Sequence, residues 1–456
     1  MTGFLLAGGV LGAVAASALA TSVAPAPAQA LDACFSSALT GTLKTGSASC
    51  ASAGPLQWAI AIGANTYAEV AGGLFNLALA VGDNSLAYTT PDVGGSYFNI
   101  ATAAAGGYAQ ASDGIFQIAT AFGSQPNENS GAFATYGTFG VARAIGHNAW
   151  AQTGAGGNLE RVSAFNIARA VGDNSTAFAQ FGFGNSSRAF GLNSYAAAYD
   201  GNVNIARALG NGAVSNAGGS PSTPASFNIA RALGPSTDAY AGTGDFNIAS
   251  ALGTAVQAQA GGIDIGRGSL NIARAVGSNS YAGAGAFDAT ESVLNIASVI
   301  GDASEAYATY GSLNTARVFG NTSVAQAGGI DIGRGSLNIA RAAGSNSYAG
   351  AGAFDATESV LNIASVIGDG SDAYAGIGNL NTARVFGNTS VAQAGPGSGR
   401  RAIIFGSNQT KIDPPQVANA RRAAASVRSA SHRKSGGGGL ASHDQLPATQ
   451  LPGLAN

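Results

Sequence analysis

The chain contains 456 residues, of which 68 are glycine and only 10 % are charged, and its formal net charge is −2. Ordinary globular domains have more Lys and Glu on their surfaces and more Leu, Ile and Met in their cores, so this composition argues against a set of such domains. The mean hydropathy of +0.17 also excludes a charge-rich disordered chain. We infer a tightly wound array of small residues with a narrow interior.

Residues 1–30 are predicted to be a secretory signal peptide. The segment is apolar and rich in small residues as far as Ala20, and Ala28-Gln29-Ala30 resembles a cleavage site. No Lys or Arg precedes the apolar stretch, which is atypical for such a signal. The alternative is a retained membrane anchor, but glycines and prolines interrupt the run. We therefore expect a secreted or cell-surface protein without a stable transmembrane segment after cleavage.

The two cysteines of the chain, Cys34 and Cys50, both follow the predicted cleavage site. In an oxidising compartment they are expected to form a disulfide. A loop of this length stabilises the fold by about 3 kcal/mol when it is closed. We assign residues 31–55 to an N-terminal cap that this disulfide clips together. Redox or metal chemistry is the alternative, but there are too few potential zinc ligands nearby.

A long internal repeat dominates the body of the chain. Gly261–Ala327 recurs as Gly328–Ala394, an offset of 67 residues, with six differences. One of these differences is Val276, which becomes Ala343 in the second copy. A block that is inserted whole in this way is typical of a solenoid, in which each coil contacts only its neighbours.

A smaller motif of eight residues, ending in glycine, recurs along residues 56–406. Most copies begin 19 or 24 residues after the previous one, which indicates one coil with an optional extra loop. In the copy at Phe98 the glycine falls one place late, and the copy at Gly184 is degenerate. The seventeen copies begin at Leu56, Phe75, Phe98, Phe116, Phe139, Phe165, Gly184, Val203, Phe227, Phe246, Leu270, Leu294, Leu313, Leu337, Leu361, Leu380 and Gly399.

The motif is typical of a short strand followed by a turn. Positions 1 to 8 are Phe or Leu, mostly Asn, usually Ile, Ala, then Arg, Ser or Thr in the middle of the array, Ala or Val, a bulky apolar residue, and Gly. Eight such residues are too few for a stable helix. The x-Asn-Ser-x-Ala-x-Ala pattern that follows predicts a turn and a second strand. We therefore predict an all-β fold, a parallel β-solenoid (β-helix or β-roll) of about seventeen short coils with flexible termini.

Strand alternation places the odd positions of the motif on one face and the even positions on the other. If Arg at position 5 points outward, then Ala and Asn line the interior, and Phe, Ile and Leu lie outside. If the large residues point inward, a bend or bulge must turn Arg outward. We expect the second arrangement, because a continuous stripe of exposed Phe and Ile is costly.

Arginine placement is the clearest chemical signal in the body. Nine arginines occupy position 5, and stacked coils would align them into a broken row. One interpretation is a surface for anionic glycans or other cell-envelope components; the other is solubility, with pairing to Asp83, Asp173, Asp302 or Glu305. The nine arginines are Arg143, Arg169, Arg188, Arg207, Arg231, Arg274, Arg317, Arg341 and Arg384.

Other chemistry is poorly supported, and we predict no catalytic residues, no metal and no cofactor. His147 is the only histidine in the body, so a Ser–His–Asp arrangement would depend on it alone. The sequences around Asp264 and Asp331 lack the spacing of calcium-binding repeats. No phosphate-binding loop or interleaving of aromatic and basic residues indicates nucleic-acid binding.

The C-terminal residues 407–456 differ from the repeats and are predicted to be a basic, mostly disordered tail. Pro414-Pro415 breaks the pattern and Gly436–Gly439 resembles a linker. Between them, Gln416–Lys434 is rich in Ala and Arg and would suit a short helix. Docking of this basic segment on an anionic envelope is the functional alternative.

Three segments resemble the head repeats of trimeric autotransporter adhesins: Ala170–Ala177, Ala275–Ala282 and Phe319–Ala325. The resemblance recurs over residues 56–395 and implies a left-handed parallel β-roll that binds host matrix. The coil here is longer, arginine stands where that family has an apolar residue, and no stalk or membrane-anchor strands follow. Trimerisation and anchoring are therefore not implied. The Ala/Gly bias is also similar to that of repetitive secreted proteins of mycobacteria.

These observations predict a non-enzymatic, secreted or cell-envelope structural or adhesive repeat protein. The alternative is a binding module for an anionic polysaccharide or envelope polymer, which would use the row of arginines. Self-association is a further expectation. A lyase or hydrolase is disfavoured, because the acidic residues recur with the repeat and do not mark one unique site.

Overall fold

The structure is a computed structural model of the chain. It describes residues 32–54, 56–89, 95–123, 130–154, 163–219, 223–262, 268–285, 292–309, 311–320, 322–328, 335–344, 346–352, 359–368, 371–387, 389–406 and 408–413. The predicted signal peptide and the predicted tail from residue 414 onward lie outside these residues. The described part contains strands and turns but no helix. It forms two compact units, unit 1 (Met1–Ala177) and unit 2 (Phe178–Asn456).

Unit 1 has a first sheet, a second sheet and short strands at a third side. The first sheet comprises β1 (Ala33–Ser37), β2 (Gly41–Thr45), β4 (Trp58–Ile62), β6 (Leu77–Val81), β9 (Ile100–Ala104), β11 (Ile118–Phe122), β13 (Val141–Ile145) and β16 (Ile167–Val171). The second sheet comprises β3 (Ser49–Ser52), β5 (Tyr67–Val70), β7 (Leu86–Thr89), β10 (Tyr108–Ile115), β12 (Gly131–Thr138), β14 (Trp150–Thr153) and β17 (Thr176–Ala179), which crosses the unit boundary. The short strands are β8 (Ser96–Tyr97) and β15 (Ser163–Ala164).

Unit 2 repeats this arrangement. Its first sheet comprises β19 (Ser186–Phe190), β21 (Ile205–Leu209), β23 (Ile229–Leu233), β25 (Ile248–Thr254), β28 (Ile272–Ser278), β31 (Ile296–Ile300), β34 (Thr315–Val318), β37 (Ile339–Ala342), β40 (Ile363–Ser365), β42 (Thr382–Arg384) and β44 (Arg401–Ile403). Its second sheet comprises β20 (Tyr195–Ala198), β22 (Val214–Ala217), β24 (Asp238–Ala241), β26 (Gln257–Ala260), β29 (Tyr281–Ala284), β32 (Glu305–Ala308), β35 (Val324–Ala327), β38 (Tyr348–Ala351), β41 (Asp372–Ala375), β43 (Val391–Ala394) and β45 (Thr410–Asp413). Its short strands are β18 (Gly182–Phe183), β27 (Gly268–Ser269), β30 (Ser292–Val293), β33 (Gly311–Ser312), β36 (Gly335–Ser336) and β39 (Ser359–Val360).

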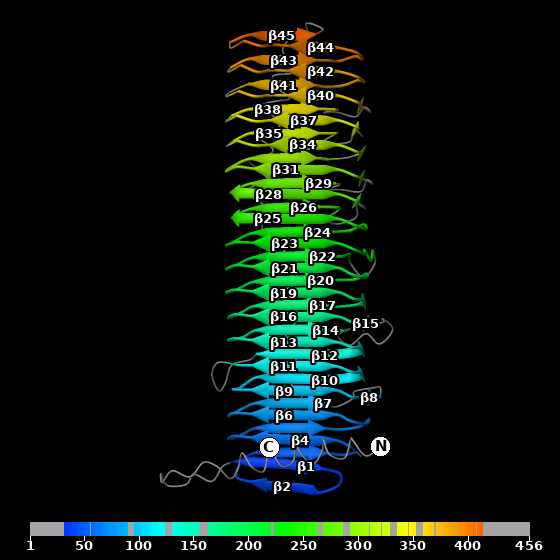
Figure 1. Ribbon diagram of the computed structural model, residues 1–456, viewed down its shortest axis with the longest axis vertical. Coiled ribbons are helices and arrows are strands. Elements are labelled where there is room, and N and C mark those ends of the chain that lie inside the picture. The colour runs from blue at the N-terminus through cyan, green and yellow to red at the C-terminus, as the bar shows by residue number, and fades with distance from the viewer. Residues whose placement is uncertain are drawn as a thin grey trace, which may run out of the picture. The chain divides into compact units, whose positions relative to one another are not determined.

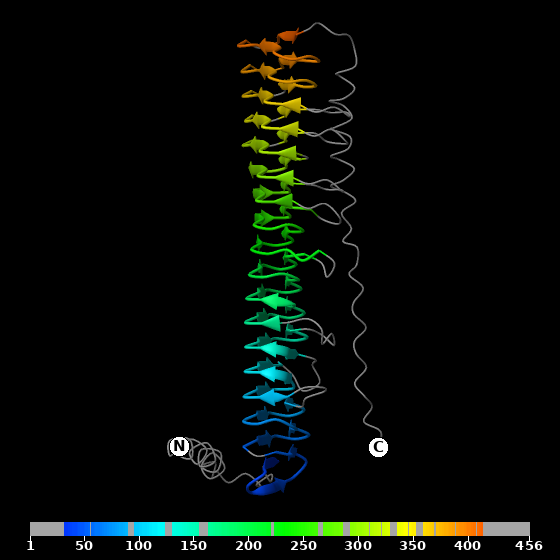
Figure 2. The ribbon, with the colours of Figure 1, turned by 90° about the vertical axis from the view of Figure 1, so that its right-hand side faces the viewer.

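Within each unit the coils stack so that every motif strand pairs in parallel with the same strand of the next coil (Figures 1 and 2). The register is that of the repeat: in the β21–β23 pair, Ile205 lies opposite Ile229 and Leu209 lies opposite Leu233. The second sheet follows the same rule, as in β22–β24. The predicted all-β parallel β-solenoid is therefore confirmed.

The N-terminal cap closes the edge of unit 1 with an antiparallel hairpin. β1 pairs in antiparallel fashion with β2 on one side and with β4 on the other. Cys34 in β1 and Cys50 in β3 form the predicted disulfide, with an S–S distance of 2.01 Å. β2 is exposed along its whole length and carries Lys44, a residue type that protects sheet edges from pairing with other chains.

The interior of each unit is lined by alanine and asparagine, and the prediction that the large residues point inward is wrong. The alanines at positions 4 and 6, such as Ala206 and Ala208, are fully buried. The space between the sheets admits only small side chains: the hydroxyl of Ser215 in the second sheet accepts from the Arg207 backbone N–H (3.0 Å) and donates to the Ala230 carbonyl (2.9 Å) of the first. Valine occupies position 6 in four coils and Ile404 occupies it in the last described coil, but neither Phe nor Leu stands at position 4 or 6.

The residue at motif position 1 has a left-handed backbone conformation, and this conformation determines which side chains point outward. Phe227, for example, has φ 61°, although a side chain in this region costs roughly 1–2 kcal/mol. At this position the chain bends at a corner of the coil, so that the side chain of position 1 points outward and that of the following asparagine points inward. Strand alternation then places Ile, Arg and Leu of positions 3, 5 and 7 on the outside. No bulge is required to expose the arginine.

The buried asparagines form a ladder of hydrogen bonds that offsets the strain at these corners. The backbone N–H of Asn228 donates to Oδ1 of Asn204 at 3.1 Å, and that of Asn247 donates to Oδ1 of Asn228 at 2.8 Å. The Asn204 Nδ2 donates to the carbonyls of Tyr199 (2.9 Å) and Ala225 (2.7 Å). Each side chain therefore satisfies backbone groups of its own coil and of the next, which buried polar groups require.

The turn after the motif also has the predicted form. Ser175 is buried, and its hydroxyl donates to the carbonyl of Gly172 at 2.7 Å, while Asn174 has φ 54°. Glycine is needed at position 8 because successive backbones approach closely there. A Cβ on Gly210, which has φ 140°, would lie 2.3 Å from the carbonyl oxygen of Gly234.

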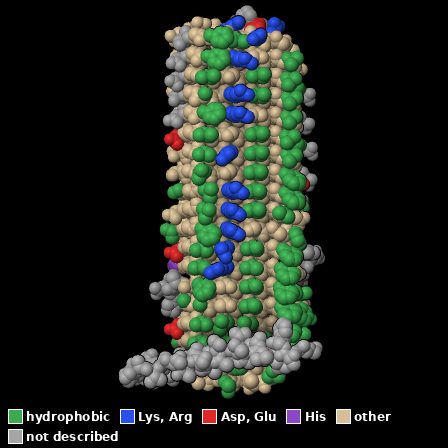
Figure 3. Space-filling model, viewed as in Figure 1, with side chains coloured by type: hydrophobic (Ala, Val, Ile, Leu, Met, Phe, Trp, Pro, Cys, Tyr) green, Lys and Arg blue, Asp and Glu red, His purple; other side chains and the backbone are tan. Residues whose placement is uncertain are grey.

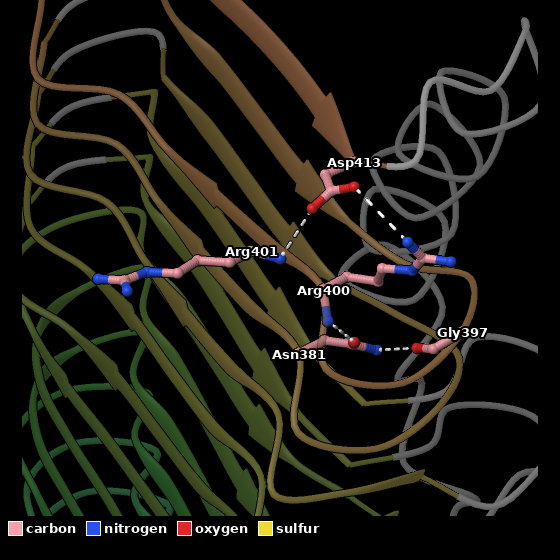
Figure 4. A network of polar contacts seen from close by, with 5 residues as sticks. All are labelled: Asn381, Gly397, Arg400, Arg401 and Asp413. Atoms are coloured by element: carbon pink, nitrogen blue, oxygen red, sulfur yellow. Dashed lines mark hydrogen bonds and ion pairs between the residues drawn. The ribbon is translucent and has the colours of Figure 1, made fainter.

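The last described coil extends beyond residue 406, the predicted end of the repeats, because β45 pairs with β43. Arginine replaces asparagine at position 2, but the Arg400 N–H still donates to Oδ1 of Asn381 at 2.9 Å (Figure 4). The Arg400 guanidinium lies 3.9 Å from the Asp413 carboxylate, which also accepts the Arg401 N–H at 3.1 Å (Figure 4). The coil therefore keeps the ladder contact and adds an ion pair.

Candidate binding surface

The outer face of the first sheet, made by motif positions 1, 3, 5 and 7, holds every arginine singled out in the sequence. In each unit these positions form parallel rows, with the position 5 row flanked by hydrophobic rows (Figure 3). The rows are continuous because the parallel register places identical motif positions opposite one another.

The arginine row of unit 2 has seven members, interrupted by three serines. Arg207 lies opposite Arg188 on one side and Arg231 on the other, so three guanidinium groups follow in consecutive coils. Unit 1 contributes one such pair, in which Arg143 lies opposite Arg169. The sequence of position 5 in unit 2 is Arg188, Arg207, Arg231, Ser250, Arg274, Ser298, Arg317, Arg341, Ser365, Arg384 and Ile403.

The predicted pairing of these arginines with acidic residues is wrong for the described part of the chain. There, none of the nine arginines makes an ion pair, and Arg400–Asp413 is a pair outside the row. The four proposed acids bind local donors instead: Asp83 the Ala64 N–H (2.8 Å), Asp173 the His147 N–H (3.0 Å), Asp302 the Ser278 N–H (2.8 Å) and Glu305 the Tyr307 hydroxyl (2.7 Å).

The arginine row is an electrostatic cost that nothing on its own face offsets. Adjacent coils lie about 4.8 Å apart, less than the Debye length of about 8 Å at physiological ionic strength. Neighbouring guanidinium groups therefore repel one another, and the intervening serines relieve only part of this repulsion. An anion that lay along the row would remove the repulsion and gain attraction to several charges at once.

The flanking rows are mostly apolar and exposed, which is the arrangement that the sequence left open but that we did not favour. In unit 2 the exposed fraction is 37 % for Ile272 in row 3, 49 % for Ile300 in row 7 and 50 % for Phe246 in row 1. Contiguous apolar surface of this extent marks an interaction site in most soluble proteins. Strand alternation already indicated that these residues share a face with Arg, and the usual preference for buried Phe and Ile led to the wrong choice between the two arrangements.

In unit 1 the position 1 row is a column of stacked phenylalanine rings. Because the rings lie face to face along the column, they present their edges to the solvent. Such edges make an apolar ridge and are unsuited to stacking against the flat face of a sugar ring. The ring centroids of Phe75–Phe98, Phe98–Phe116, Phe116–Phe139 and Phe139–Phe165 are 4.8, 4.9, 4.8 and 4.7 Å apart.

In the second sheet of unit 2, two partly buried titratable side chains, Asp238 and Tyr240, lie on β24. Burial raises the pKa of Asp238 to about 6, and a hydrogen bond from Gln257 opposes this shift. Burial also raises the pKa of the neighbouring Tyr240 phenol, and the Asp238 charge adds to that shift. We therefore expect Asp238 to make the stability of this unit depend on pH.

We expect the stability of unit 2 to rise as the pH falls from about 6 to about 4, with Asp238 as a contributor. The folded chain binds the Asp238 proton more tightly than the unfolded chain, so its contribution is present below pH 3.8 and is lost as the pH rises through 6. The change is of the order of 1 kcal/mol, since the carboxyl is only partly buried. Thermal melts of Asp238→Asn should show higher stability at pH 7 and a flatter profile over this window. An unchanged profile would contradict this assignment.

The other residues considered in the sequence for metal or catalytic chemistry form no cluster within the described residues. No group of three or more His, Cys, Asp or Glu side chains there is placed to hold a metal ion. Asp264 and Asp331 lie outside the described residues. His147 lies in a turn and donates its backbone N–H to Asp173. A search of the same residues for a helix long and apolar enough to cross a bilayer finds none.

Comparison with known proteins returned no matching family model, curated protein or solved structure. The resemblance to autotransporter head repeats therefore stays a prediction, and the function must be argued from the surface itself.

Proposed function

We propose that this protein is a non-enzymatic, secreted or envelope-associated adhesive scaffold whose arginine row binds an anionic component of the cell envelope. The observation that carries the proposal is the alignment of seven arginines in unit 2, none of them ion-paired within the described residues. A surface kept only for solubility would gain from interspersed charges of both signs. The charged residues that we singled out on this face are all positive, and they lie in a single row.

The repeat explains why such a surface suits an extended ligand. Each coil adds one position to the row, so a ligand with many anionic groups can bind several arginines together. Individual exposed contacts of this kind are weak, usually below 1 kcal/mol, but they add along a linked ligand. The chain would therefore hold a polyanion, or an anionic surface, more strongly than a small anion.

Retention on an immobilised anionic polysaccharide tests the proposal. The triple variant Arg188→Ser, Arg207→Ser and Arg231→Ser should elute at markedly lower salt, with affinity reduced roughly tenfold or more. Serine occupies position 5 in three native coils, so the fold should tolerate the changes.

The matched control removes three positive charges from exposed sites that are not on this face, in Lys44→Ser, Arg400→Ser and Lys411→Ser. It should elute close to the unchanged protein. If both variants lost affinity for the polysaccharide equally, the effect would come from net charge and not from the row. If the row variant eluted at the same salt concentration as the unchanged protein, a role for the row would be refuted.

A further inference from the structure

We propose that the outer face of the first sheet of unit 2 binds the surface of an anionic lipid layer. The apolar rows would enter the interface, and the arginines would bind the headgroups. This inference rests on the proposed function, since it names the class of anionic partner that the same arginines bind. It goes further because it assigns a role to the apolar rows on both sides of them.

The arrangement of the rows suits a lipid interface. Residues two apart on a strand are separated by about 7 Å, so each position 5 residue has the side chains of positions 3 and 7 at that distance on either side. In the β23 coil these three positions are Ile229, Arg231 and Leu233. All seven arginines of unit 2 have an apolar residue at position 7, and four of them have isoleucine at position 3, whereas Arg188, Arg317 and Arg384 have Ser or Thr there. The aliphatic stem of arginine can lie along the apolar surface while its charged end stays at the polar boundary, as arginine does at membrane interfaces.

The face has no negative charge along its length, although row 3 includes Ser186, Thr315, Thr382 and Arg401 among its isoleucines. Row 7 of unit 2 contains only apolar residues, and rows 1, 3, 5 and 7 contain no acidic residue. Row 7 comprises Phe190, Leu209, Leu233, Leu252, Val276, Ile300, Phe319, Ala343, Ile367, Phe386 and Phe405. An anionic surface would therefore meet positive charge and apolar side chains along the whole face, without a repulsive contact.

Other binding partners would match either the charge or the apolar character of this surface, but not both. A soluble polysaccharide offers anions to the arginines, but its hydroxyl groups do not bury aliphatic rows. A second copy of the chain, packed by the same face, would cover the apolar rows but would bring two arginine rows together without an acid on either face. An anionic lipid layer supplies both the negative charge and the apolar medium.

Cosedimentation with vesicles tests the inference. The unchanged protein should bind vesicles of phosphatidylcholine that contain roughly a quarter phosphatidylglycerol, and should bind pure phosphatidylcholine vesicles much less. The double variant Ile229→Ser and Ile272→Ser should lose roughly tenfold in vesicle affinity and keep its retention on the anionic polysaccharide. Serine occupies the same motif position in the native β19 coil, as Ser186.

The matched control removes two exposed leucines that lie in the N-terminal cap and not on this face, in Leu39→Ser and Leu43→Ser. It should bind vesicles as the unchanged protein does. A reporter variant, Leu252→Trp, keeps row 7 apolar and should show a blue-shifted emission with the anionic vesicles. Circular dichroism of each variant checks that the β-solenoid is retained.

The outcomes separate the two proposals. Retention on the polysaccharide without vesicle binding, or vesicle binding unaffected by the isoleucine changes, would overturn the lipid inference and leave the proposed function standing. If the isoleucine changes convert a dimer of the chain to a monomer and leave vesicle binding unchanged, the lipid inference is likewise overturned and the proposed function stands. If the arginine variant binds both probes as the unchanged protein does, the proposed function and the inference both fail. An unshifted Leu252→Trp emission at saturating vesicles would also overturn the inference.

Discussion

Replacing Ala230 with leucine is expected to destabilise unit 2 by about 3 kcal/mol, whereas replacing its outward neighbour Ile229 with serine should cost about 1 kcal/mol or less. This order is the reverse of that in an ordinary globular core, where isoleucine is buried. It follows from the narrow interior, because the Ser215 hydroxyl already reaches the Ala230 carbonyl from the opposite sheet at 2.9 Å. A leucine side chain there would force the two sheets apart.

Hydrogen exchange of unit 2 is the suitable measurement, together with thermal melts, since repeat arrays can open locally and need not unfold in a single step. Amides of β21, β23 and β25 should lose protection in Ala230→Leu and keep it in Ile229→Ser. If the isoleucine change proved the more damaging of the two, the large residues would have to lie inside, and the surface described above would not exist.

The second large effect is expected at the asparagine ladder. Asn204→Leu should destabilise unit 2 by about 3 kcal/mol or more, because it removes a buried acceptor and two buried donor contacts. The Asn204 side chain accepts the N–H of Asn228 and donates to the carbonyls of Tyr199 and Ala225. The contacts with the Asn228 N–H and the Ala225 carbonyl are buried, so these two groups would be left without a partner away from water.

The same coil offers a matched control in Asn216, on the outer side of β22, whose Oδ1 is buried and accepts no hydrogen bond within the described residues. Asn216→Ala should be close to neutral, since no hydrogen bond of that oxygen is lost. Thermal melts of the two variants would show the difference. A small loss for Asn204→Leu would mean that stacking of the outer rows, and not the ladder, holds the corners in place.

Much of the fold was predictable because the repeat carries its own register. The recurrence of Asn-Ile-Ala-Arg-Ala predicts parallel strands in which like residues lie opposite one another, and Arg207 does lie opposite Arg231. The x-Asn-Ser turn and the Cys34–Cys50 disulfide were predicted from local pattern and spacing. The common face of the position 5 arginines also follows from periodicity alone.

The direction of the two faces was not predictable by the usual preference for buried Phe and Ile. That preference assumes an interior wide enough for them. Here the left-handed corner at residues such as Phe227 and the buried amide of Asn228 decide the direction. Pairing of the arginines with acids was also mispredicted, because Asp83 and Asp173 accept backbone N–H groups of the turns.

The sequence by itself therefore determined the strands, their parallel order, the disulfide and the gathering of the position 5 arginines in one row. Only the tertiary structure decided that alanine and asparagine fill the interior and that Ile, Leu and Phe lie exposed beside Arg. The physical reason is the separation of the two sheets, which is set by contacts such as Ser215 with Ala230. A single strand has two faces that satisfy the same alternation, and the width of the space between the two sheets selects which of them is buried.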